Sequence, residues 1–167
     1  VYLHAHKLMR KHWQDMPSVG DIGGDKWEQV TEHVNDNYFF IDMDKYSLEA
    51  VLRKGAELVK RKGIKCLVLD PFNKIRDVNA HSDDVNRYTM DYLAKIEAFC
   101  KKYDVLTFIV AHPTKMYKGQ DGKIEEPTMY NIKGGGEWYD ASYHGLLVHR
   151  DYEAKTTKVK VLKVKFQ

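Results

Sequence analysis

The sequence lacks the features of a membrane span, a disulfide framework or a zinc cluster. No apolar run approaches the roughly 18 residues of a membrane helix, and the mean hydropathy is −0.57. Only two cysteines occur, Cys66 in an apolar run and Cys100 near the end of a helical pattern, and both are expected to be buried. A net charge of +3 is too small to indicate nucleic acid by itself. These absences favour a globular cytoplasmic protein.

Short apolar runs alternate with helical patterns in the middle of the chain. The runs 38–41, 64–69 and 105–111 are continuously apolar, as strands buried on both faces are. A helix over 47–63 is predicted between the first two runs, and a helix over 82–103 between the last two, because each has a serine at its start and apolar residues at helical spacing. This order predicts an α/β fold with a parallel sheet and right-handed crossovers.

The two ends of the chain differ from this middle. The first 35 residues contain helical patterns, the second over Trp27–Val34, and no strand pattern. Near the other end, His144–His149 and Lys158–Phe166 are predicted to form an antiparallel hairpin. The apolar alternation slips between Val161 and Leu162, which predicts a bulge that re-aims the lysines after it.

The segment 112–136 is long, rich in glycine and without clear periodicity, which is typical of a functional loop. Tyr117 and Tyr130 interleave with its lysines, and three glycines follow. Lysines neutralise phosphates, aromatic rings stack on bases, and glycines allow close backbone approach. Acidic residues dilute the charge, so an ordinary solvated loop is an equally open interpretation. The lysines are Lys115, Lys118, Lys123 and Lys133.

Two polar residues follow the second and third apolar runs. Asp70 ends its run as a Walker B carboxylate does, and His112 ends the next one. Because ligands bind beyond the carboxyl ends of parallel strands, both are candidates for a nucleotide site. A capping role for Asp70 and a structural role for His112 remain alternatives. No G-x-x-x-x-G-K-[ST] phosphate loop occurs in the chain.

Several segments follow one another in a characteristic order along nearly the whole chain. They are Phe39–Asp42, Leu48–Lys62, Cys66–Asp70, the run ending at His112, Asn131–Gly136, Leu146–Asp151 and Lys163–Lys165. In this order and spacing they resemble the RecA-like ATPase domain of DnaB-type replicative DNA helicases, including phage helicase-primases. The resemblance implies one RecA-like domain over residues 1–167, a three-layer sandwich with a mostly parallel central sheet and a C-terminal antiparallel hairpin. It also implies that the Walker A strand and phosphate loop lie before residue 1.

The resemblance assigns roles in ATP hydrolysis to particular positions. Asp70 matches the carboxylate that holds Mg²⁺ through water, and His112 matches a sensor of the γ-phosphate. Lys163 and Lys165 match a basic pair that reaches the nucleotide of the neighbouring subunit in a hexamer, although the family usually has Arg where Lys165 stands. Arg150 resembles a residue beside that nucleotide.

For the glycine-rich loop, the resemblance implies contact with single-stranded DNA in the central channel of the ring, through the four lysines with Gly134 and Gly135. The segment Glu137–Asp140 lacks the Gln that relatives place near DNA. The parent protein would be a bacterial or phage-encoded hexamer that uses ATP and Mg²⁺ to translocate and unwind DNA, with primase as a candidate partner and no membrane partner. Without a phosphate loop, this chain is expected to bind ATP weakly and not to hydrolyse it.

Two other interpretations stay open. One is another RecA-fold ATPase, of the plasmid-replication or clock-protein kind, that uses the loop differently. The other is a non-catalytic module that binds single-stranded nucleic acid through Lys115–Lys133 without nucleotide. Salt-sensitive binding of single-stranded DNA that depends on Lys115 and Lys133 would favour the helicase and the binding module over the other ATPase.

Overall fold

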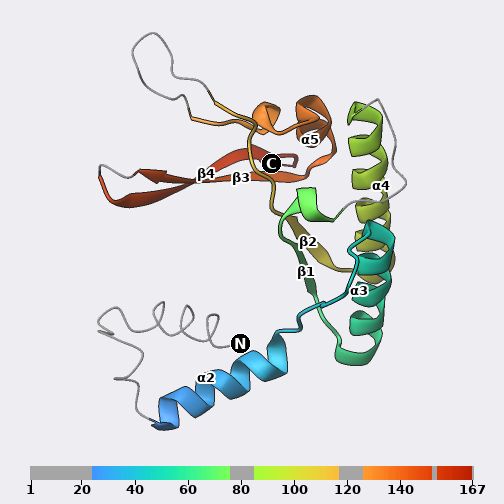
Figure 1. The fold of residues 1–167 in the computed structure, drawn as a ribbon, viewed down its shortest axis with the longest axis vertical. Coiled ribbons are helices and arrows are strands. Elements are labelled where there is room, and N and C mark those ends of the chain that lie inside the picture. The colour runs from blue at the N-terminus through green and yellow to red at the C-terminus, as the bar shows by residue number, and fades with distance from the viewer. Residues whose placement is uncertain (1–23, 76–84, 117–125, 152–153, 167) are drawn as a thin grey trace. The chain divides into compact units, whose positions relative to one another are not determined.

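The computed structural model describes residues 24–75, 85–116, 126–151 and 154–166 (Figure 1). The chain divides into two compact units, 1–43 and 44–167, and each is considered by itself. Three candidate residues of the glycine-rich loop lie outside the described residues: Tyr117, Lys118 and Lys123. Their predicted roles stay predictions.

The described part of the first unit is one helix and the segment after it. Helix α2 spans Gly24–Asn37, which extends the helix predicted over Trp27–Val34 at both ends. The prediction of a strand at 38–41 is wrong, because these residues are irregular. The Tyr38 amide still donates to the Val34 carbonyl at 2.9 Å, a helical hydrogen bond, and no strand among the described residues pairs with the segment. An apolar run without a partner strand does not form a ladder.

The second unit begins with a helix whose ends follow the sequence signals. Helix α3 spans Leu48–Lys62, and the Ser47 hydroxyl accepts a hydrogen bond from the Ala50 amide at 3.2 Å. At the other end Gly63 is left-handed, with φ of 66°, and its amide donates to the Val59 carbonyl. Both caps satisfy backbone groups that the helix leaves unpaired, so the predicted helix is confirmed.

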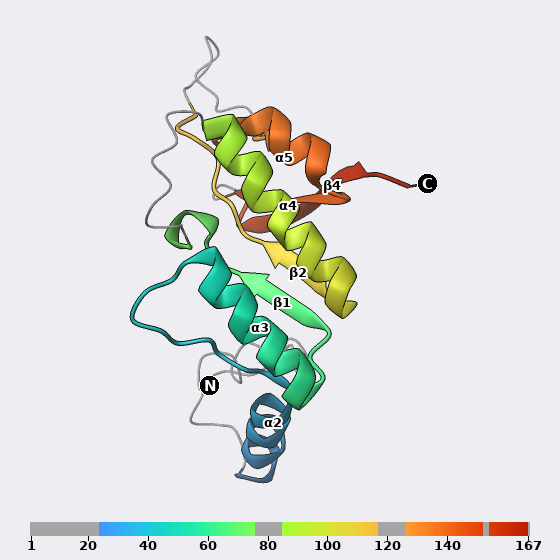
Figure 2. The ribbon, with the colours of Figure 1, turned by 90° about the vertical axis from the view of Figure 1, so that its right-hand side faces the viewer.

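A parallel pair of strands lies beside this helix. Strand β1 spans Cys66–Leu69 and pairs in parallel with β2, Leu106–Ile109. Helix α4, Val85–Tyr103, leads into β2, and α3 and α4 lie on one side of the pair (Figure 2). The predicted crossover between parallel strands is confirmed, while the predicted cap at Ser82 lies outside the described residues.

The expectation that these strands are buried on both faces is wrong. Leu67 and Leu69 are buried, whereas Val68 is 57% exposed and Leu106 is 58% exposed. Cys66 is exposed and Cys100 is only partly buried, which corrects the prediction of two buried thiols. The physical reason is that the described helices of this unit cover one face of the pair, and side chains alternate between the faces.

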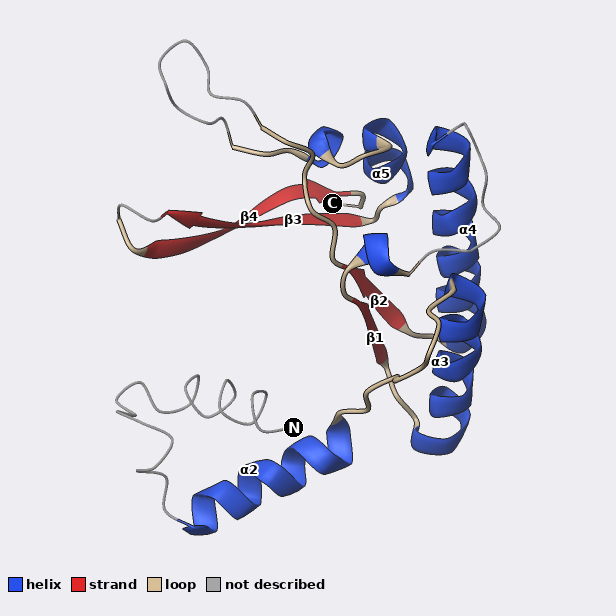
Figure 3. Cartoon of the chain, viewed as in Figure 1, coloured by secondary structure: helices blue, strands red, loops and turns tan. Residues whose placement is uncertain are grey.

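The last two strands form the predicted hairpin. Strand β3 spans His144–Asp151 and pairs antiparallel with β4, Thr156–Val164 (Figure 3). Gly145 pairs with Lys163 but Leu146 pairs with Val161, so Leu162 is the extra residue of a bulge at the predicted place. Among the described residues the hairpin is a separate sheet from β1 and β2. The α/β class is therefore confirmed, and the continuous three-layer sandwich stays a prediction.

Short helices connect the strands. The 3-10 helix η2, Phe72–Lys74, follows β1, and η3, Met129–Asn131, precedes α5, Gly135–Ala141. The segment 112–136 was expected to lack regular structure, and η3 and the start of α5 correct this expectation. Short helices held by tertiary contacts give little periodicity for a sequence to show.

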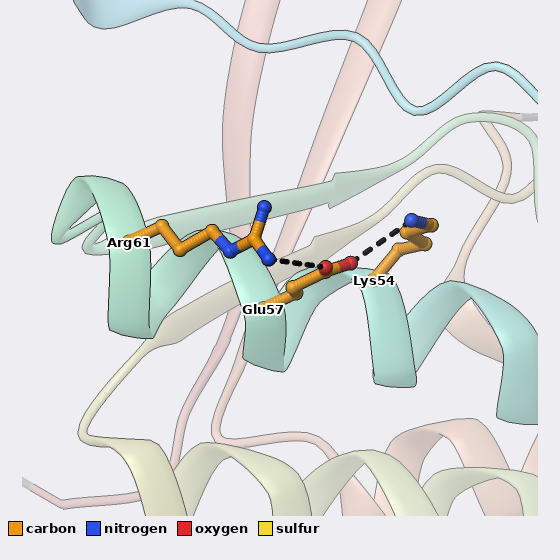
Figure 4. Close-up of polar contacts among 3 residues, drawn as sticks. All are labelled: Lys54, Glu57 and Arg61. Carbon is orange, nitrogen blue, oxygen red and sulfur yellow. Dashed lines mark hydrogen bonds and ion pairs between the residues drawn. The ribbon is translucent and has the colours of Figure 1, made fainter.

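The outer surface of α3 carries exposed ion pairs (Figure 4). The Glu57 carboxylate lies 2.9 Å from Lys54 Nζ and 3.5 Å from an Arg61 nitrogen. The hydrogen bond from Lys54 lowers the pKa of Glu57. These side chains are largely exposed to water, so their ion pairs add little to the stability of the fold.

None of the described helices is both long enough and apolar enough to cross a membrane.

Candidate functional site

The candidate nucleotide residues lie at one edge of the parallel pair. Asp70 directly follows β1, and His112 follows β2 by three residues. The Phe72 amide donates to the Val110 carbonyl at 2.9 Å, which keeps the two chains together beyond the strands. Because β1 and β2 are parallel, their carboxyl ends share an edge, as the sequence predicts. Both side chains are exposed.

An aromatic cluster fixes the chain just after Asp70. The Phe72 ring packs edge-on against Tyr92 of α4, with centroids 4.9 Å apart, and against Trp138 of α5, with centroids 4.8 Å apart. All three side chains are buried. Edge-to-face aromatic packing adds to the burial of these large rings. The backbone that presents Asp70 is therefore anchored to two helices.

The Asp70 carboxylate fits a water-mediated Mg²⁺ contact better than a complete metal site. Within the described ranges it makes no hydrogen bond or ion pair, and no three His, Cys, Asp or Glu side chains gather into a metal-binding group. Mg²⁺ usually keeps several waters and takes one or two carboxylates together with substrate phosphates. One exposed carboxylate at this edge matches that chemistry.

The base of the glycine-rich loop is closed by hydrogen bonds. The Asn131 carbonyl accepts from the Thr114 amide at 2.7 Å and from the Thr114 hydroxyl at 2.9 Å. Pro113 and Ile132 form an isolated antiparallel bridge. Lys115 and Lys133 follow these tied residues, so the structure brings two of the four candidate DNA-binding lysines to the same base; both are exposed.

The two candidate DNA-binding glycines, Gly134 and Gly135, each have a packing reason for lacking a side chain. Gly134 has φ of 87°, and a Cβ there would lie 2.5 Å from the Thr89 hydroxyl of α4. A Cβ on Gly135 would lie 2.9 Å from the carbonyl carbon of Tyr130. A Cβ on Gly136 would meet nothing within 4 Å. The predicted DNA contacts of Gly134 and Gly135 stay predictions beside this packing role.

The two lysines near the end of β4 lie on aromatic rings. Lys163 Nζ donates to the carbonyl oxygens of Tyr139 and Asp140 and lies 4.5 Å from the centre of the Tyr139 ring. Lys165 Nζ lies 4.7 Å from the centre of the Tyr143 ring. Ammonium groups over aromatic faces gain electrostatic attraction. Within this chain, both candidate trans-acting cations therefore have partners.

Arg150 lies far along the hairpin from Lys163. Its guanidinium donates to the Thr157 hydroxyl at 3.0 Å. Thr157 is also its register partner, whereas Lys163 pairs with Gly145. At about 3.4 Å per residue, Gly145 and Arg150 are about 17 Å apart along β3. The structure does not bring these two candidate residues together.

Sequence reasoning missed the roles of Trp138 and Tyr139. Trp138 is buried, and its indole nitrogen donates to the Lys133 carbonyl at 3.0 Å. The Tyr139 ring stacks on Tyr130, with centroids 5.0 Å apart and planes at 20°. The available signal was a tryptophan that follows paired glycines at the start of a helix. Trp138 ties the glycine-rich segment to the core.

Similarity to known proteins is found in the sequence and in the fold. No family model matches the chain. Its sequence is 28% identical over 164 residues to the Twinkle homolog protein, chloroplastic/mitochondrial, of Arabidopsis thaliana, a match that covers 89% of this chain and 22% of that protein. Its fold is similar to a solved structure of an ATPase domain, with a TM-score of 0.70 and 14% identity, over 97% of this chain and 58% of that one.

The structural similarity shows that the chain has the same class of fold as that solved ATPase domain. The sequence match adds similarity to a Twinkle homolog. Together the two findings confirm the resemblance to DnaB-type ATPase domains. The chain spans about a fifth of the Twinkle homolog and less than two thirds of the matched ATPase-domain chain.

Proposed function

We propose that this chain is part of a ring-forming, ATP-dependent DNA helicase that translocates on single-stranded DNA. The observation that carries the proposal is the parallel pairing of β1 and β2, which puts Asp70 and His112 at one edge of a RecA-like fold. In such folds this edge is where a ligand binds. The similarity to DnaB-type domains supports ATP and Mg²⁺ as the ligands.

At this edge, Asp70 would hold Mg²⁺ through water and His112 would sense the γ-phosphate. Lys163 and Lys165 would stabilise charge on the phosphoryl group of the neighbouring subunit's nucleotide. Lys163 must then exchange its carbonyl partners for phosphate oxygens. Since Arg150 lies about 17 Å further along the hairpin, it would contact a different part of the neighbouring site.

The loop base supplies the DNA-binding part of the proposal. Lys115 and Lys133 are exposed and lie next to the Thr114–Asn131 bonds, so two cations stand together where a phosphate backbone could pass. Lys118 and Lys123 would extend this surface. The same Thr114 is two residues from His112, which places the DNA-binding base close in sequence to the sensor of the nucleotide.

Fluorescence anisotropy with single-stranded DNA tests the nucleic-acid part. Each phosphate contact contributes about −0.7 to the slope of log affinity against log salt, so Lys115→Ala with Lys133→Ala should flatten the slope by about 1.4. The charge-matched control, Lys45→Ala with Lys60→Ala, changes exposed lysines outside the loop and should leave the slope unchanged. An equal change in both double variants would contradict the assignment.

Nucleotide assays test the other part. This chain should bind ATP weakly and show no turnover, because no phosphate loop occurs in its sequence. Measurable turnover that Asp70→Asn abolishes would contradict this expectation. Salt-dependent DNA binding by a longer protein that contains this domain, without nucleotide-dependent ring assembly, would instead indicate a passive binding module.

A further inference from the structure

Tyr130 and Tyr139 form a stacked aromatic pair at the base of the glycine-rich loop, called here the tyrosine platform. Their rings are 5.0 Å apart at 20°, and Tyr130 is 59% exposed while Tyr139 is partly buried. Tyr130 is thus the outer member. An isolated exposed tyrosine is ordinary on protein surfaces, but this ring is already supported by a second ring.

The backbone beneath the platform is held in place. The Asn131 side-chain oxygen accepts from the Thr128 amide at 2.7 Å and from its hydroxyl at 2.9 Å, which caps η3. Gly135 lies close against the Tyr130 carbonyl. A ring whose position is fixed before binding loses little further freedom when a ligand stacks on it.

One lysine contacts the platform, and two more lie near it along the chain or through the hydrogen bonds of the loop base. Lys163 Nζ lies 4.5 Å from the centre of the Tyr139 ring. Lys133 follows Tyr130 by three residues and is exposed, and Lys115 is tied to the same region through Thr114 and Asn131. An aromatic face beside cations matches single-stranded nucleic acid, whose bases stack while its phosphates pair with lysines.

We propose that Tyr130, supported by Tyr139, is a stacking site for an unpaired nucleobase of single-stranded DNA. This inference rests on the proposed function and deepens it, because it assigns contact with a base where the lysines account only for the phosphates. Stacking is tolerant of sequence since every base has a π-face, so the site would add affinity without reading sequence.

The test compares two ligands by fluorescence anisotropy at low salt: oligo(dT) and an abasic phosphodiester chain of equal length. The unaltered chain should bind oligo(dT) at least about fivefold more tightly than the abasic chain. Tyr130→Ala should remove this preference and leave affinity for the abasic chain within about twofold, since phosphate contacts remain. Tyr130→Phe keeps the ring and should retain the preference.

Tyr38→Ala, which removes another exposed tyrosine, is the matched control and should change neither affinity. Equal salt-dependent affinity for the two ligands, or an equal loss of both in Tyr130→Ala, would overturn the platform while leaving the proposed function standing. No salt-dependent binding of either ligand would overturn both. If Tyr130→Ala altered only self-association in sedimentation, the ring would belong to a protein interface and the inference would be wrong.

Discussion

Replacing Gly135 by alanine probes the contact that positions the tyrosine platform. The new Cβ would lie 2.9 Å from the Tyr130 carbonyl carbon and 3.0 Å from its Cα. The Cβ would come nearer still to the Tyr130 carbonyl oxygen, and carbon atoms in contact prefer about 3.5 Å or more, so α5 or η3 must move by more than about half an ångström. Forcing an extra methyl group into packed structure costs about 1–3 kcal/mol. The gain from replacing a helical glycine offsets at most about 1 kcal/mol of this.

Gly136→Ala is the matched control, because it lies in the same helix and its Cβ would meet nothing within 4 Å. We expect it to stabilise the chain by up to about 1 kcal/mol. Urea unfolding followed by circular dichroism measures both free energies. Gly135→Ala should also weaken oligo(dT) binding, since the Tyr130 ring would be displaced. Equal free energies of unfolding for the two variants would refute the reasoning.

Three further predictions concern stability. Ser47→Ala and Gly63→Ala should each cost about 1 kcal/mol in urea unfolding, because one removes a cap acceptor and the other places a Cβ at φ of 66°. Phe72→Ala should cost about 3–5 kcal/mol and reduce the near-ultraviolet dichroism of the aromatic cluster; an unchanged spectrum would contradict the packing. The hydrogen bond from Lys160 lowers the pKa of Glu126, so their ion pair contributes stability above the unfolded-state pKa of Glu126. This stability is lost as the pH falls through the lowered folded-state pKa. Carboxyl NMR titration should show that Lys160→Ala raises the pKa of Glu126.

Local signals in the sequence predicted a large part of the second unit. Ser47 and Gly63 mark the ends of α3 because each satisfies helix-end groups through its own chemistry. The slip in alternation at Leu162 predicted the bulge because strand side chains alternate strictly between faces. The shared edge of Asp70 and His112 followed from the strand–helix–strand order, which requires parallel pairing.

The features that the sequence could not predict, which are strand pairing at 38–41, burial of the strand faces and helix α5, depend on which elements pack against each segment. The run 38–41 is apolar enough for a strand, yet pairing needs a partner that composition does not reveal. The exposed faces at Val68 and Leu106 show the same limit, since burial on a second face depends on which elements cover it. Helix α5 is short, and Trp138 holds it through a contact with the Lys133 carbonyl that no periodic pattern encodes.

Under the proposed function, the loop base joins the nucleotide residue His112 to the DNA-binding residues through a chain of hydrogen bonds and ring contacts. His112 is joined to Thr114 by two peptide units, and Thr114 is bonded twice to Asn131. Asn131 caps η3, whose Tyr130 packs against Gly135 and Tyr139 of α5. Tyr139 in turn holds Lys163. Under the proposed function, a phosphate contact at His112 would act on backbone that is hydrogen-bonded to the platform. A base on Tyr130 would act on the ring beside Lys163, the cation proposed to serve the next subunit.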